Sequence, residues 1–155
     1  MDRLVIRFIE RPDSGSRKQM LKWFCYVFGL SGIGEDSPIE ERILERFTEA
    51  AYNNVGLSSS ELDLGTKMAR STVIYHLNRF IDAGLIVRHG RKYYLRASEM
   101  HKAIEEIEYD INRELQRMLD TAREFDNLML SSMKDGKKVR VDVHGRGKGA
   151  QRRRR

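Results

Sequence analysis

The chain has 155 residues, of which 40% are hydrophobic and 34% are charged, and it carries a net charge of +6. This length fits one domain with extensions or two small domains, and the hydrophobic fraction is sufficient to fill a core. The single cysteine, Cys25, excludes an intrachain disulfide and a thiolate metal cluster. No apolar run approaches the roughly 18 residues of a membrane span, and the N-terminus lacks a signal-peptide pattern, so we expect a cytoplasmic protein.

Residues 1–36 predict a strand and a helix, followed by a glycine-rich linker. Residues 3–11 alternate weakly between apolar and polar side chains, which predicts a strand. A helix is then expected to begin at Asp13 or Ser16 and to continue to about Phe28. The aromatic residues of this helix favour packing against the rest of the subunit or against a partner. A hydrophobic pocket for an effector is the alternative.

A second helix is predicted from residue 38 to about Asn53, and it opens a domain of residues 37–97. Ser37 is a suitable N-cap, Pro38 is a favoured first residue, and two glutamates fall in the first turn. An apolar stripe at helical spacing indicates that this helix supplies core rather than chemistry. Leu57 is expected to pair with the strands that follow.

Residues 58–83 have the pattern of two consecutive helices. Three serines before Glu61 predict the start of the first helix, which a Gly-Thr pair makes short or kinked. The second helix is predicted from about Arg70 to Ala83, because its apolar residues recur at steps of three and four. Gly84 follows it, at the position where a left-handed backbone is easiest for glycine.

A two-stranded hairpin is predicted over residues 85–96, with a tight turn at His89-Gly90. Neighbouring residues of a strand point to opposite faces. One of Tyr93 and Tyr94 must therefore face the core.

The string RSTVIYHLNRFIDAGLIVRHGRKYYLR, residues 70–96, resembles the recognition helix and wing of ArsR- and MarR-type winged-helix transcription regulators, many of them archaeal. The resemblance implies a mainly α fold with a small β wing, that is, a winged helix-turn-helix domain. It also implies sequence-specific binding to double-stranded DNA, usually as a dimer on a palindrome. The chain departs from the family's pattern at Ala69, where a Ser or Thr N-cap is common, so Ser71 or Thr72 is expected to cap instead.

In a winged helix the second helix of the motif enters the major groove, so its outward residues are the expected readers. The residues expected to contact base edges are Arg70, Ser71, Thr72 and Tyr75. Those expected on phosphates or in the wing are Lys67, Arg79, Arg88, His89, Arg91 and Lys92. Arginine can bind guanine through two hydrogen bonds, and basic side chains around a hairpin glycine suit phosphates or a narrow minor groove.

A long helix is predicted from Ser98, as its N-cap, to residue 133. Its apolar residues keep to one face for seven turns, and about 34 residues span roughly 50 Å, more than a winged-helix core covers. We therefore predict pairing with a second copy of the chain, with packing against the N-terminal helix as the alternative. The predicted dimer contacts are Ile104, Ile107, Ile111, Leu115, Met118, Ala122 and Phe125.

Charge is distributed unevenly along the sequence. Residues 58–98 carry a net charge of +4, residues 99–133 carry −5, and residues 134–155 carry +8. Such a separation fits a polyanionic partner. The last segment is predicted to be disordered unless its three alternating valines add a short strand. Its basic residues either bind phosphates without sequence preference or only solubilise the chain.

Other functional classes receive less support from the sequence. It contains no Ser-His-Asp spacing, no Walker loop and no HExxH motif, so we expect neither an enzyme nor a cofactor. His101 and Glu105 are four residues apart on the long helix, but two ligands rarely hold a metal. The alternatives are a winged-helix module that contacts a transcription-machinery or chromosome-associated protein, and RNA binding through the basic tail. The clustering of Arg70, Arg79 and Arg91 on one outward face favours DNA over a protein partner.

Overall fold

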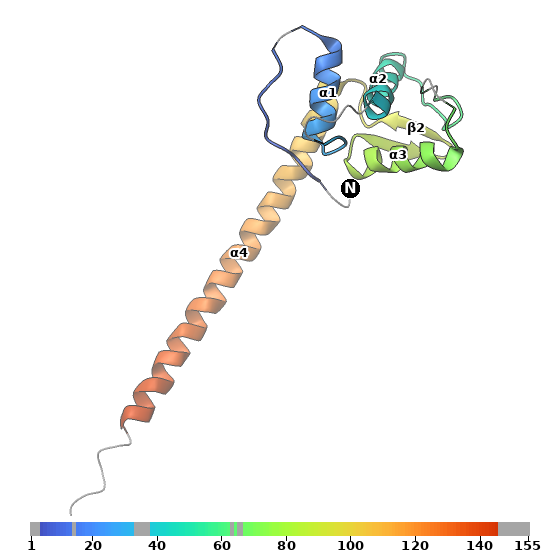
Figure 1. Ribbon diagram of the computed structural model, residues 1–155. Helices are drawn as coiled ribbons and strands as arrows, with labels where there is room; N and C mark the ends of the chain where they lie inside the picture. The colour runs from blue at the N-terminus through green and yellow to red at the C-terminus, as the bar shows by residue number, and fades with distance from the viewer. Residues whose placement is uncertain (1–3, 14, 33–37, 63, 65–66, 146–155) are drawn as a thin grey trace, which may run out of the picture. The chain divides into compact units, whose positions relative to one another are not determined.

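The computed structural model (Figure 1) describes residues 4–13, 15–32, 38–62, 64 and 67–145, with side chains up to residue 136. Within these residues the chain forms four helices and one two-stranded antiparallel sheet. This confirms a mainly α fold with a small β element. The chain divides into two units, Met1–Glu108 and Tyr109–Arg155. No helix among the described residues combines the length and apolarity that a membrane span requires.

The first helix, α1, spans Arg17–Val27 and begins where the sequence predicted. The Ser16 hydroxyl accepts a hydrogen bond from the backbone N–H of Gln19 at 3.3 Å. It thereby satisfies one of the amide groups that a helix N-terminus leaves without an intrahelical partner. The C-cap is Phe28, so the predicted end is also confirmed.

The strand predicted over residues 3–11 is wrong, because the described part of this segment runs beside α1 without pairing to a strand. The Arg7 backbone N–H donates to the carbonyl of Val27 at 2.9 Å. The Trp23 indole donates to the carbonyl of Glu10 at 3.1 Å. Alternating side chains can suit a strand, but a β-ladder needs the free edge of another strand. The neighbour here is a helix, which offers no such edge.

Helix α2 spans Pro38–Tyr52 and packs against α1 and strand β2. Ser37, its predicted N-cap, lies outside the described residues. Four of the predicted core residues of α2 are buried: Ile43, Leu44, Phe47 and Ala50. The helix therefore supplies core, as its sequence indicated.

Helix α3 spans Arg70–Asp82 and confirms the second helix of the predicted motif. It buries Val73, Leu77 and Phe80, which its three- and four-residue spacing places on one face. Gly84 follows the C-cap with a φ of +79°, in the left-handed region that suits glycine. The Gly84 N–H donates to the carbonyl of Ile81 at 2.9 Å, and the Leu85 N–H donates to the carbonyl of Phe80 at 3.1 Å. These two bonds form a Schellman motif, which ends the helix.

The first helix of the predicted motif is absent from the described residues between α2 and α3. Ser58 and Glu61 form a single turn, in which the Glu61 N–H donates to the Ser58 carbonyl at 3.1 Å. The Glu61 carboxylate accepts from the Ser58 N–H at 2.9 Å, as in a capping box. Leu62 and Leu64 are nevertheless buried. A cap alone does not offset the entropic cost of nucleating a short helix.

Strands β1, Ile86–His89, and β2, Lys92–Leu95, pair antiparallel and form the predicted hairpin. Gly90 takes a φ of +63° at the turn. Leu57 bridges to Tyr93 through two backbone hydrogen bonds of 2.9 and 2.8 Å, which confirms the predicted pairing. Tyr93 is only 4% exposed, so it is the hairpin tyrosine that enters the core.

Helix α4 spans Met100–Gly145 and is longer than predicted. The Ala103 N–H donates to the Glu99 carbonyl at 3.0 Å, so Ser98 lies one residue too early to be the N-cap. The disorder or strand predicted from residue 134 is wrong as far as Gly145. Once a helix is nucleated, each further residue adds a bond without a new nucleus, so weak helix formers can extend it. The predicted tail beyond residue 145 lies outside the described residues.

The first turns of α4 belong to the core of the unit Met1–Glu108. Ala103 is inaccessible and Ile107 is 2% exposed, so Ile107 is not available as the dimer contact that the sequence predicted. The Arg96 side chain donates to the Glu106 carboxylate at 3.0 Å and to the Gly84 carbonyl at 3.3 Å. These bonds join the start of α4 to the end of α3.

We predict that Leu77→Ala lowers the free energy of unfolding by about 2–5 kcal/mol, because it leaves a cavity in the core. Tyr75→Ala, on the same helix, is the control, because Tyr75 is 60% exposed. It is expected to change the stability by no more than about 0.5 kcal/mol. Urea unfolding of both variants measures the difference. Equal losses would show that α3 does not bury the face assigned to it.

Candidate nucleic-acid interface

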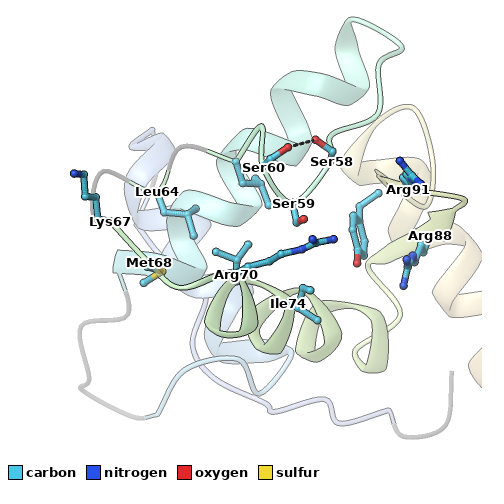
Figure 2. A pocket seen from close by; sticks show the side chains of 13 residues that line it. Ser58, Ser59, Ser60, Leu64, Lys67, Met68, Arg70, Ile74, Arg88 and Arg91 are labelled. Atoms are coloured by element: carbon cyan, nitrogen blue, oxygen red, sulfur yellow. Dashed lines mark hydrogen bonds between the residues drawn. The ribbon is translucent and has the colours of Figure 1, made fainter.

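A hollow of about 770 Å³ lies among residues 58–62, 64 and 67–68, the start of α3 and the hairpin (Figure 2). Its floor includes the buried side chains of Leu62, Leu64 and Val73. Four basic side chains line it: Lys67, Arg70, Arg88 and Arg91. Three consecutive serines, Ser58 to Ser60, add hydroxyl groups to the lining.

The described charged side chains that line this hollow are all basic. Its described lining contains four cations and no carboxylate. Figure 2 shows Arg70 extending across the hollow in the direction of Arg88 and Arg91. Like charges held close together repel, so the arrangement is stabilised by an anion that enters between them. Arginine forks and serine hydroxyls are also suitable hydrogen-bond donors to phosphate oxygens.

The predicted base readers lie on the solvent-facing side of α3. Arg70, Ser71, Thr72 and Tyr75 are all exposed, with Tyr75 60% accessible. The N-cap is Ala69, and no side chain caps the helix, so the prediction that Ser71 or Thr72 caps it is wrong. The two hydroxyl groups are therefore not used as caps.

The hairpin presents its basic residues in two ways. Arg88 is held against the hairpin, because its Nε donates to the Gly90 carbonyl at 2.9 Å and its guanidinium lies 5.5 Å from a tyrosine ring centre. Arg91 and Lys92, at and just after the turn, are exposed. His89 is also exposed, and its ring lies against that of Tyr94. Arg91 and Lys92 are thus the hairpin cations most accessible to a ligand.

Arg79 has a different role from the other predicted contacts. Its guanidinium donates to the Glu40 carboxylate and to the Leu30 carbonyl, each at 2.8 Å. The Glu40 side chain is only 9% exposed. His76 Nδ1 lies 3.0 Å from the same carboxylate, although not in hydrogen-bonding geometry. Arg79 therefore links α3 to α2 and to the loop after α1, and this pairing competes with the predicted phosphate contact.

Sequence reasoning missed the partnership of Arg79 and Glu40. In the sequence, Glu40 is one of two acidic residues in the first turn of its helix. Arg79 and Glu40 are 39 positions apart. No local spacing indicates such a pair, and only the tertiary fold brings the two side chains together.

Cys25 is buried and chemically passive. The pKa of its thiol is raised from 9.0 to about 12, chiefly by burial and then by the nearby carboxylates of Glu41 and Glu40, while Arg79 acts in the opposite direction. The thiolate is the reactive form of cysteine, so this side chain is inert at neutral pH. Among the described residues no group of three or more His, Cys, Asp or Glu is placed to hold a metal ion.

Comparison of the chain with known protein families, with characterised proteins and with solved structures gives no match.

We predict that Arg79→Ala lowers the free energy of unfolding by about 1–3 kcal/mol, because the buried Glu40 carboxylate loses its charged partner. Arg70→Ala is the matched control: it removes the same charge from the same helix at an exposed position, and stability should stay within about 0.5 kcal/mol. Urea unfolding at pH 7 checks both values. Stability unaffected by Arg79→Ala would mean that the pairing with Glu40 contributes nothing to the fold.

We also predict slow labelling of Cys25 by iodoacetamide in the folded protein between pH 7 and 9. The unfolded chain should react rapidly, because its thiol begins to ionise near the ordinary pKa of 9.0 whereas the folded thiol does so near 12. The folded state consequently loses stability from this group as pH rises from 9 towards 12. Mass spectrometry of labelled protein, with and without urea, measures the two rates. Comparable rates would contradict the buried position.

Proposed function

We propose that this chain is a sequence-specific regulator of transcription that binds double-stranded DNA as a homodimer, with α3 in the major groove. The observation that supports this most directly is the basic hollow beside the exposed face of α3. DNA supplies a dense array of phosphates, which suits a group of cations whose described neighbours in the lining include no carboxylate. The resemblance of residues 70–96 to winged-helix regulators points to the same class.

The dimensions of α3 suit the major groove. Its 13 residues span about 20 Å at 1.5 Å per residue, and the groove is about 12 Å wide and accepts one helix. Arg70 at the start of the helix is then positioned to reach a guanine edge. Ser71, Thr72 and Tyr75 face the same solvent side and are proposed as the other base contacts.

The hairpin is proposed to contact the DNA backbone or minor groove. Arg91 and Lys92 are exposed, while Lys67 and Arg88 border the hollow between the hairpin and α3. Contacts of this kind position a protein on the duplex without reading sequence. Arg79 is left out of the proposed interface, because its guanidinium is already paired with Glu40.

The proposed dimer depends on the part of α4 in the unit Tyr109–Arg155. Of the predicted contacts, Leu115, Met118 and Phe125 are 48%, 66% and 60% exposed. Apolar side chains in water are unfavourable, at about 25 cal/mol per Å² of exposed area, so a partner that covers them is stabilising. Two copies would also present two copies of α3 to a DNA site with two-fold symmetry.

We predict that Arg70→Ala weakens binding to a duplex selected from a random pool by about 1–3 kcal/mol, while binding to a shuffled duplex changes less. Arg11→Ala is the control, because it removes an equal charge from an exposed residue that does not line the hollow. Fluorescence anisotropy at fixed salt measures both affinities. Equal losses on the two duplexes would exclude Arg70 as a base reader.

A preference for hairpin RNA over every duplex in the same assay would replace DNA by RNA in the proposal. Absence of binding to any nucleic acid would favour the alternative of a protein-docking module.

We further predict that removal of residues 146–155, which include six Lys or Arg, weakens binding to all duplexes alike. Each phosphate contact that is lost should reduce the slope of log K against log salt by about 1. A salt titration of the full and shortened chains on selected and shuffled duplexes measures this slope. An unchanged slope would mean that the segment only aids solubility.

A further inference from the structure

The apolar stripe of α4 has a regular spacing and no partner in the described chain. The stripe consists of Ile111, Leu115, Met118, Ala122, Phe125 and Met129. These residues are separated by alternating steps of four and three, the spacing of a two-stranded coiled coil. All except the partly buried Ile111 are exposed, and Met129 is 47% accessible.

We propose that a second copy of the chain covers this stripe and that its α4 runs antiparallel to the first. This inference rests on the homodimer proposed above and specifies its geometry. Two observations decide the direction: the distribution of charge along α4 and the order of large and small residues in the stripe.

Charge changes sign from one end of α4 to the other. Residues 99–108, around its start, carry four acidic and one basic side chain, and because Glu106 is already paired with Arg96 the net charge of this end is −2. Residues 132–141 carry four basic and one acidic side chain, a net charge of +3. A parallel pair places like charges beside each other at both ends. An antiparallel pair places opposite charges together and also aligns the two helix dipoles favourably.

One antiparallel register pairs every residue of the stripe with another residue of the stripe. In this register Ile111 faces Met129 of the second copy, and Leu115 faces its Phe125. The same register pairs residues 99–108 with residues 132–141. A shift by one heptad instead places Leu115 against Ser132 and Ile111 against Gly136, which leaves apolar surface uncovered.

Residue size supports the same register. Met118 faces Ala122, so a long side chain lies opposite a short one and the two fill the space together. A parallel pair in register would place Ala122 against Ala122 and Phe125 against Phe125. Leu119, which is 52% exposed beside the stripe, lies next to the two-fold axis of the antiparallel pair. Leu119 of the second copy therefore covers Leu119 of the first.

Disulfide trapping tests the direction, with variants that each carry one introduced cysteine in addition to the buried Cys25. Leu115→Cys and Phe125→Cys are prepared separately, one with a size tag, then mixed under reducing conditions and oxidised. The antiparallel register places residue 115 opposite residue 125, so the mixture should form a linked heterodimer. Each variant alone should remain unlinked. In a dimer of one variant the two introduced cysteines, one in each copy, are about 15 Å apart along the axis, whereas a disulfide needs Cα atoms within about 7 Å.

The chain offers its own control for this experiment. The unmodified protein contains only Cys25, whose buried thiol should not link two chains. Ile111→Cys and Met129→Cys form a second pair that the register also places opposite each other. This pair should likewise give a linked heterodimer, and it replaces the first pair if Leu115→Cys or Phe125→Cys weakens the dimer. Light scattering of the reduced proteins should give twice the 18.1 kDa mass of one chain.

Each other outcome overturns the inference in a different way. Linked homodimers from single variants show a parallel pair, and linkage of Leu115→Cys with Ser132→Cys shows the shifted register. A mass of one chain for the unmodified protein excludes the pairing altogether. Duplex binding is measured separately by anisotropy. A parallel dimer that binds DNA therefore refutes only the antiparallel direction. An antiparallel dimer that binds none of the duplexes refutes only the proposed DNA function.

Discussion

Burial of one face of α3 is the constraint on which the rest of the first unit depends. Leu77 and Phe80 are wholly inaccessible, and Val73 is 7% exposed. A helix has a fixed angular spacing of side chains, so the burial of these three residues leaves the opposite face in solvent. The Schellman turn after α3 then directs the chain into β1, and the hairpin comes to border the same hollow as Arg70.

Three arginines of the first unit acquire different roles from their surroundings. Arg79 enters a partly buried pair with Glu40 and stabilises the contact of α3 with α2. Arg88 lies on its own hairpin, bonded to a backbone carbonyl. Arg70 is exposed beside a hollow whose described lining has no acidic side chain. A positive charge is available to a ligand only where the fold has not already supplied its partner.

The second unit poses a different physical problem, because its helix has more apolar surface than its own described residues cover. Phe125, Met118 and Leu128 are each at least 60% exposed. Most of the stability of a helix in a protein comes from packing of its amphipathic face, and a long isolated helix lacks this term. In the proposed dimer a second copy of the chain provides the missing packing, and the opposite charges at the two ends of α4 set its direction.

The sequence determined the local features, because capping groups, turn glycines and apolar spacing act over a few residues. Thus α1 with its Ser16 cap, the end of α3 at Gly84, the hairpin and the bridge of Leu57 to Tyr93 were all predictable. Tertiary structure alone decided the pairing of Arg79 with Glu40, the burial of Ile107, and the absence of a described helix at Ser58–Glu61. These features depend on which distant surfaces meet, and neither periodicity nor capping signals in a single segment carry that information.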